Sequence, residues 1–297
     1  MKRFFLRPYL LWAFLLAWML QAAAIGFAWN GQAQVFRLVL AVSMYAPFAA
    51  VLLAKIPLRG MGWHLRLKGK ARLFLAAWFG WAILGTLGAA LYFLLFPAAF
   101  DRSGALLLAQ LGETGLKQLE TQGLTPQNYL WIQIAAALTY APLMNTFAAL
   151  GEEVGWRGAL YPALKERFGA LKGRLLGGLI WGVWHWPVMI LAGYNYGTAY
   201  WGAPVLGPLL FCLICTALGT LFDALYEKTD CIWIPALAHG AFNAFSSLPL
   251  LFLNPAYTDR LTLGPLPIGL IGGLPLLLLG AWVLLKGGKA EQGREAP

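Results

Sequence analysis

The stretch VLGPLLFCLICTALGTLF, residues 205–222, contains no charged side chain. A helix that crosses a bilayer needs about 20 predominantly apolar residues. Residues 205–225 meet that requirement with Asp223 as their one charge, so they predict a membrane span. The same criterion selects seven further runs, at residues 9–28, 33–54, 73–97, 129–151, 175–195, 232–253 and 264–285. We therefore predict an all-α fold, a polytopic transmembrane helical bundle of about eight spans.

The composition of the whole chain agrees with this class. Of 297 residues, 60% are hydrophobic and 11% are charged, and the mean hydropathy is +0.66. A soluble domain carries about 25% charged residues, and a disordered chain combines low hydrophobicity with high charge, so both classes are excluded. The net charge of +10 is explained by the lysines and arginines that collect in cytoplasmic loops. No nucleic-acid partner is expected.

The distribution of lysine and arginine predicts the orientation. With a cytoplasmic N-terminus, the basic segments 55–72 and 165–174 and the polar tail fall on the cytoplasmic side. The opposite side keeps Arg37, Arg102, Lys117 and Arg260. By the positive-inside rule, we expect an integral protein of the plasma (inner) membrane with both termini in the cytoplasm.

Two segments outside this pattern need a separate interpretation. The first apolar run could be a signal peptide with a cleavage site at Ala22-Ala-Ala24, but its length favours a retained helix. Residues 100–127 form the largest non-cytoplasmic segment, and their leucine spacing predicts a short amphipathic helix on the membrane surface. Membrane lipid is therefore an expected partner.

Polar residues occur inside three of the predicted spans, where they are rare and usually functional. The first group is Glu152, Glu153 and Arg157, the second is His185, and the third is His239 with Asn243. On a helix, residues four apart share a face, so Arg157 can pair with Glu153 while Glu152 stays free. Each group alone could be structural: an interfacial salt bridge, a packed histidine, or a polar stripe that joins helices.

Together the three groups have the composition of a hydrolytic site. A carboxylate and a histidine can activate water, and a histidine and an amide can donate hydrogen bonds to a tetrahedral oxyanion. Alternatively, Glu152, His185 and His239 could hold zinc, a possible cofactor, with an open water position. The H-E-x-x-H pattern of zinc proteases and the G-x-S-x-G pattern of serine hydrolases are both absent from the sequence.

The same residues resemble the CPBP family of intramembrane proteases, which includes the type II CAAX prenyl endopeptidases and bacteriocin-processing relatives. The family pattern EExxxR, [F/W]xxxH, HxxxN reads here as residues 152–157, 181–185 and 239–243, with Trp181 in place of the commoner phenylalanine. The resemblance covers about a third of the chain.

The resemblance also implies roles for these residues. It implies that Glu152 and His185 activate water, that His239 and Asn243 stabilise the oxyanion, and that Arg157 orders the glutamate pair. It further implies a substrate peptide bond near the membrane surface, in a peptide or lipidated protein such as a prenylated CAAX protein. Some relatives act without chemistry as scaffolds or immunity proteins.

We divide the chain into N-terminal helices and a basic loop without a motif (1–128), a CAAX-protease-like core (129–255), and a last helix with a polar tail (256–297).

Two other functions stay open: a proton-coupled transporter whose glutamates and histidines form a relay, and a non-catalytic binding or immunity protein of the same fold. The paired halves with broken helices that are typical of transporters are not found.

We interpret Cys212, Cys215 and Cys231 as apolar packing residues. Gly177, Gly178, Trp184 and Trp186 either shape the pocket or pack, and Asp223 either assists the site or faces the cytoplasm.

Overall fold

The structure, a computed structural model, describes residues 6–65 and 68–295, and side chains as far as residue 287. Arg66 of the basic segment 55–72 lies outside the described residues, as do Lys2 and Arg3 at the N-terminus and the side chains of the tail. The described residues form helices and contain no strand, apart from one isolated bridge between Phe100 and Leu253. The predicted all-α class is therefore confirmed.

The helices are α1 (Leu6–Trp29), α2 (Ala33–Ser43), α3 (Ala46–Leu53), α4 (Ala71–Leu95), α5 (Ala105–Thr121), α6 (Pro126–Leu138), α7 (Tyr140–Gly155), α8 (Tyr161–Trp184), α9 (Trp186–Ala192), α10 (Leu206–Thr229), α11 (Trp233–Phe245) and α12 (Leu274–Glu295). A π-helical turn, Trp156–Leu160, joins α7 to α8, and short 3-10 turns occupy Pro97–Ala99, Leu248–Phe252 and Pro255–Arg260.

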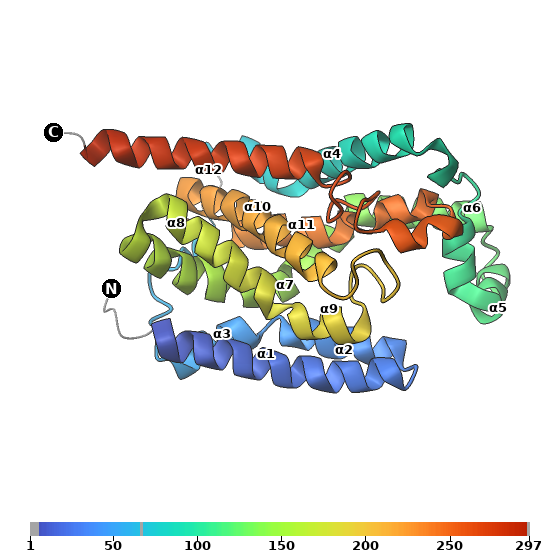
Figure 1. The fold of residues 1–297 in the computed structure, drawn as a ribbon, viewed down its shortest axis with the longest axis horizontal. Helices are drawn as coiled ribbons and strands as arrows, with labels where there is room; N and C mark the ends of the chain where they lie inside the picture. Colours follow the sequence, from blue (N-terminus) through green and yellow to red (C-terminus); the bar gives the residue numbers. More distant parts are fainter. Residues whose placement is uncertain (1–5, 66–67, 296–297) are drawn as a thin grey trace.

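The helices form three layers (Figure 1). α1, α2 and α3 lie along one side, α4 and α12 lie along the opposite side, and α7, α8, α10 and α11 lie between them. α7 packs against α11 and α8 packs against α10. α5 and α6 lie together at one end of the bundle. The central layer carries all three polar motifs.

Five helical stretches of the described residues are long and apolar enough to cross a membrane: Leu6–Trp29, Ala33–Leu53, Ala71–Leu95, Tyr140–Ala192 and Leu206–Thr229. The predicted number of about eight spans is not confirmed. The predicted spans 129–151 and 175–195 both overlap Tyr140–Ala192, and 264–285 is helical only from Leu274. α11 has 13 residues and is almost wholly buried, so its apolar run reflects burial in protein rather than contact with lipid.

The long fourth stretch changes direction at Gly169, whose φ of 79° and ψ of 163° are not helical. A methyl group added at Gly173 would lie 2.7 Å from the backbone nitrogen of Lys165, which shows how closely the two arms approach. Because only glycine adopts a φ of this sign readily, Gly169 allows the reversal. The arms before and after it carry Glu152 and His185 into one layer.

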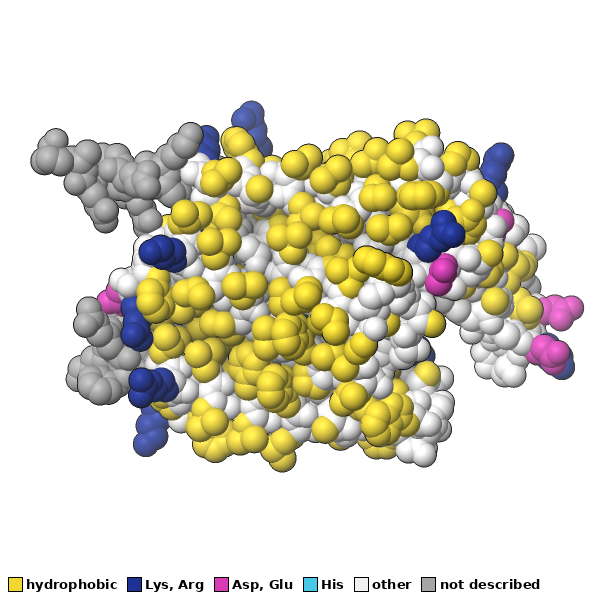
Figure 2. All heavy atoms as spheres, in the orientation of Figure 1, with side chains coloured by type: hydrophobic (Ala, Val, Ile, Leu, Met, Phe, Trp, Pro, Cys, Tyr) yellow, Lys and Arg dark blue, Asp and Glu magenta, His cyan; other side chains and the backbone are white. Residues whose placement is uncertain are grey.

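The surface of the bundle is mostly apolar. Figure 2 shows hydrophobic side chains over the middle of the molecule, with lysine and arginine towards its ends. Large apolar side chains such as Leu11, Leu94 and Leu278 are more than half exposed. A soluble monomer rarely exposes apolar patches of more than a few hundred Å², so this surface identifies an integral membrane protein.

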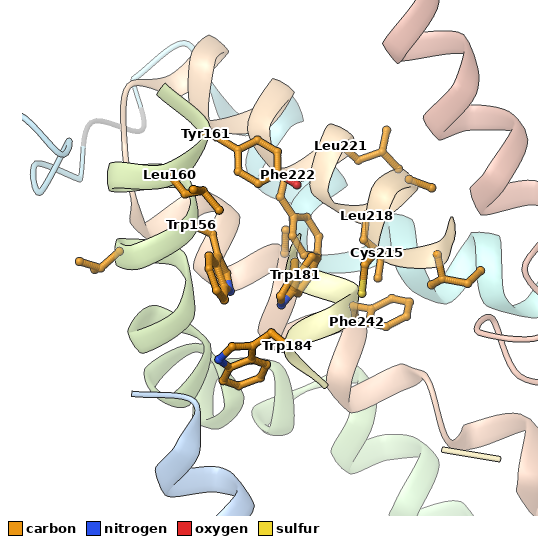
Figure 3. Packing of buried hydrophobic residues seen from close by; sticks show 14 of the residues in the cluster. Trp156, Leu160, Tyr161, Trp181, Trp184, Cys215, Leu218, Leu221, Phe222 and Phe242 are labelled. Carbon is orange, nitrogen blue, oxygen red and sulfur yellow. The ribbon is translucent and has the colours of Figure 1, made fainter. Parts of the chain in front are cut away.

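The interior beside the motifs is packed with aromatic side chains (Figure 3). Trp156 and Trp184 are fully buried and meet edge to face, with ring centroids 6.0 Å apart. The three cysteines are buried and not disulfide-bonded, which agrees with their interpretation as packing residues. A methyl group at Gly177 or Gly178 would clash with Tyr161 or Thr216, so these glycines serve helix packing.

Asp223 lies away from the motifs, in a network of charges at one end of the bundle. Lys165 Nζ lies 2.7 Å from Asp223 Oδ1, and Arg174 Nε lies 2.8 Å from Asp223 Oδ2. Both cations also pair with Glu227 at 2.6 Å. The network joins the two arms of α8 to α10, which gives Asp223 a structural part.

Candidate active site

A cavity of about 480 Å³ lies between the central layer and α1 and α2. Glu152, His185, His239 and Asn243 all line it. The structure therefore brings together four of the six predicted site residues around one cavity. Glu153 and Arg157 are fully buried behind its wall.

Glu152 lies at the buried floor of the cavity, with 2% of its surface exposed. Its Oε2 accepts hydrogen bonds from Trp156 Nε1 at 3.0 Å and from Trp181 Nε1 at 2.7 Å. Its Oε1 accepts no hydrogen bond from any described residue. The two indoles thus fix the carboxylate through one oxygen and leave the other available.

The two indole donors were not predicted from the sequence. Trp156 begins the π-helical turn, a local irregularity that is frequent at functional sites. Trp181 occupies the aromatic position of the second motif, where a phenylalanine would supply the ring without the N–H donor. The sequence signal for Trp156 is its spacing of four residues from Glu152, because such residues share a helix face.

Glu153 is the centre of a buried ionic cluster. Arg157 Nη1 donates to Glu153 Oε1 at 2.9 Å, as the spacing predicts. The same oxygen lies 2.8 Å from His239 Nδ1. The Arg157 guanidinium also lies over the rings of Trp181 at 4.6 Å, Tyr161 at 4.8 Å and Phe222 at 5.1 Å, which are cation–π distances. Arg157 is therefore held on several sides and fixes Glu153.

His185 lies at the junction of α8 and α9, with its Nδ1 2.9 Å from the carbonyl oxygen of Trp181. A carbonyl only accepts, so we assign the proton of the neutral ring to Nδ1. Nε2 then carries a lone pair. The rings of Trp184 and Phe211 pack against the imidazole edge to face, with centroids 4.7 and 5.0 Å away. These contacts fix the orientation of the ring.

The helix break beside His185 frees backbone groups, because Pro187 at the start of α9 has no N–H to donate. The carbonyl oxygen of Trp184 accepts from Gln21 Nε2 at 2.9 Å and from Trp18 Nε1 at 3.2 Å. Both donors are on α1, in the part of the sequence without a readable motif. Gln21 is 1% exposed and also lines the cavity. Its sequence signal is a lone amide inside an apolar run.

His239 and Asn243 lie one turn apart on α11, and both face the cavity. The His239 ring stacks on Phe222, with centroids 5.5 Å apart, and meets Trp181 at 5.3 Å. A methyl group at Gly240 would lie 2.5 Å from the backbone nitrogen of Thr146 on α7. Gly240 therefore allows a close approach of α11 to α7, and this approach brings His239 to Glu153.

The donor atoms do not form a zinc site. Among the described residues, no three His, Cys, Asp or Glu side chains are grouped so that they could hold a metal ion. Each candidate ligand has one donor atom in a hydrogen bond and one that is left over: Glu152 Oε2 is held by two indoles, His185 Nδ1 by a carbonyl and His239 Nδ1 by Glu153. Glu152, His185 and His239 are thus not assembled as a three-ligand metal site in this structure, and zinc stays a prediction.

Comparison with known proteins agrees with the motifs. Residues 133–245 match the family model described as type II CAAX prenyl endopeptidase Rce1-like, and this segment contains all six predicted site residues. A 50-residue segment is 38% identical to "CAAX prenyl protease 2" of Methanococcus maripaludis. The matched segment covers 16% of this chain and 18% of that protein. The chain thus spans less than a fifth of this relative's length in the match. The resemblance to this family is confirmed over residues 133–245.

Proposed function

From the similarity of residues 133–245 to the type II CAAX prenyl endopeptidases, we propose that this protein is an intramembrane endopeptidase. It hydrolyses a peptide bond of a membrane-associated protein or peptide with water activated by Glu152 and His185. The observation that carries the proposal is the arrangement of Glu152, whose Oε2 is held by two indoles while Oε1 is left without a described partner in the cavity.

The proposal assigns the attack on the peptide bond to a water molecule in the cavity. Glu152 Oε1 accepts one proton of this water, and the lone pair on His185 Nε2 accepts a hydrogen bond from its other proton. Positioned general bases of this kind contribute about 10²–10⁴-fold to rate. Since the carboxylate is buried among aromatic rings, few other water molecules compete for it.

The negative charge that develops on the carbonyl oxygen of the scissile bond needs hydrogen-bond donors directed at that oxygen. The side-chain amide of Asn243 is one donor. His239 is the second, through Nε2 in its protonated form, because its Nδ1 already faces the Glu153 carboxylate. Glu153 is then the counter-ion of His239, and Arg157 holds Glu153 in place.

The proposed reaction is the addition of water to the peptide carbonyl, followed by cleavage of the C–N bond. The water oxygen forms a bond to the carbonyl carbon while its proton passes to Glu152. The tetrahedral intermediate collapses, the C–N bond breaks, and Glu152 returns the proton to the leaving nitrogen. The products are a new carboxylic acid and a new amine, and the second water proton passes from the acid to the amine as the two products ionise. Because the donor set does not form a three-ligand metal site, we propose a glutamate mechanism.

The proposal is tested by mapping new protein termini in membranes of cells that express the wild type, Glu152→Gln or Glu120→Gln. Glu120 is exposed on α5 and lies outside the cavity, so its variant is the matched control. We expect termini that appear with the wild type and the control and are absent with Glu152→Gln. A chelator added to the isolated membranes should leave the cleavage unchanged. Identical termini in all three membranes would refute the proposed function.

A further inference from the structure

The cavity has a closed end and an open end. Its floor is formed by Glu152, Trp181 and His239, none of which exposes more than 5% of its surface. Its other lining residues include Arg37 and Ser247, and these are exposed. A substrate therefore enters past these rim residues and moves inward to Glu152.

The rim lies at one end of the bundle. Arg37 is on the second turn of α2, which follows the loop that ends α1, and Ser247 follows the end of α11. Trp29 Nε1 on the last turn of α1 donates to the carbonyl oxygen of Leu191 near the end of α9 at 3.0 Å. This end of α1 and the beginning of α1, near the N-terminus, lie at opposite ends of one side of the bundle (Figure 1).

The basic residues occupy the opposite end, where α1 begins, α3 ends, α4 begins, α8 reverses, and α10 and α12 end. Lys70 Nζ donates to the carbonyl oxygen of Thr229, and Ile232 N donates to the carbonyl oxygen of Gly62 at 2.9 Å, so these segments meet. The described lysines and arginines of this basic end are Arg7, Lys55, Arg59, Lys68, Lys70, Arg72, Lys165, Arg167, Lys172, Arg174, Lys228 and Lys286.

From the basic end, packed side chains close the way to the site. Trp156, Arg157 and Tyr161 are each 0% exposed and lie between Glu152 and the Lys165–Asp223 ion pair along the chain. Arg157 and Tyr161 are further in cation–π contact. A peptide that approached from the basic end would have to displace this packed layer.

We infer that the cavity opens on the non-cytoplasmic face of the membrane and that the substrate is a peptide segment presented from that face. The basic end faces the cytoplasm by the positive-inside rule, and the rim lies at the other end. The assignment of the substrate rests on the proposed function, whereas the direction of the opening does not. A cytoplasmic lipidated tail would meet the closed end, so a secreted or outward-facing peptide fits this site better.

Cysteine labelling in intact cells tests the direction of the opening. Ser247→Cys and Arg37→Cys place thiols at the rim, and Lys172→Cys and Arg59→Cys place them at the basic end; all four positions are exposed. The wild type is the background control, because its own cysteines are buried. We expect a membrane-impermeant maleimide to label the rim variants in intact cells and the basic-end variants only after permeabilisation. The reverse pattern would overturn the inference.

A second measurement addresses the substrate. A membrane-anchored reporter carries a protease-sensitive segment, taken from a mapped cleavage site, on either its non-cytoplasmic or its cytoplasmic side. Cleavage that depends on Glu152 and is confined to the non-cytoplasmic segment supports the inference, and cleavage confined to the cytoplasmic segment refutes it. Labelling needs no activity, so absence of any Glu152-dependent cleavage with correct labelling would count against the proposed function alone.

Discussion

Trp181 Nε1 donates a hydrogen bond of 2.7 Å to Glu152 Oε2, although 29 positions separate the two residues in the chain. The bond joins the first motif to the second across the cavity floor. Trp181 also supplies the carbonyl oxygen that contacts His185 Nδ1 and one of the rings beneath Arg157. Trp181, from the second motif, therefore contacts Glu152 and Arg157 of the first motif. It also positions His185, the histidine of the second motif.

Replacing Trp181 by phenylalanine separates these contributions, because the ring is kept and the N–H donor is lost. A hydrogen bond to a charged group contributes about 1.5–3 kcal/mol, so we expect kcat/KM to fall about 10- to 100-fold while the fold is retained. Trp201→Phe is the matched control, since Trp201 is 84% exposed. Equal cleavage rates for Trp181→Phe and the control would show that the indole N–H has no part in positioning Glu152.

The substitution Glu153→Gln tests the buried ionic cluster. It removes the carboxylate charge shared by Arg157 and His239, which leaves Arg157 buried without a counter-ion. Breaking a buried ion pair in this way costs about 3–5 kcal/mol, so thermal unfolding in detergent should begin at a clearly lower temperature. Glu113→Gln, at an exposed position on α5, should unfold like the wild type. An unchanged unfolding temperature for Glu153→Gln would contradict the structural part given to this cluster.

Two glycine substitutions test the approach of α11 to α7. The methyl group of Gly240→Ala would lie 2.5 Å from the backbone nitrogen of Thr146, whereas the methyl group of Gly80→Ala meets no atom within 4 Å. Overpacking costs about 1–3 kcal/mol, so Gly240→Ala should destabilise the protein and slow cleavage by displacing His239. Gly80→Ala should be neutral or slightly stabilising, because alanine favours helix over glycine. Equal unfolding temperatures for the two variants would show that α11 is not held at this distance.

Arg37 is the one lysine or arginine among the described residues that line the cavity. Because it lies at the exposed rim, its charge should attract acidic substrate segments before they reach Glu152. We expect Arg37→Gln to raise KM for an acidic peptide with little change in kcat, and the difference from wild type to shrink at high salt. A fall in kcat at constant KM would instead assign Arg37 to the chemical step.

The all-α class and the meeting of Glu152, His185, His239 and Asn243 at one cavity could be predicted from the sequence, because polar side chains in apolar helices gather where they find partners. The pairing of Glu153 with Arg157 follows from helical spacing alone. The sharing of Glu153 with His239 does not, since 86 positions separate the two residues. The contacts of Trp18 and Gln21 with the Trp184 carbonyl were likewise beyond prediction, because they arise only when α1 packs beside the break between α8 and α9.

The number of spans shows a different limit of the sequence. An apolar run does not distinguish a helix surrounded by lipid from one surrounded by protein, and α11 has the same kind of composition as α4. Only the packing reveals that α11 is short and enclosed, while α4 exposes Leu75, Ile83 and Leu87. The π-helical turn at Trp156 was not predicted either, since it replaces the regular helix that the sequence favours.

The central claim is that Glu152 activates the attacking water, and the most direct test is the single-turnover cleavage rate of Glu152→Gln with a mapped substrate peptide. Glutamine keeps the size of the side chain and an oxygen for the two indole donors but cannot accept the proton of water. We predict that the rate falls about 10²–10⁴-fold while the affinity for the peptide and the unfolding temperature stay close to those of the wild type. A rate within a few-fold of the wild type, at unchanged affinity, would contradict the account.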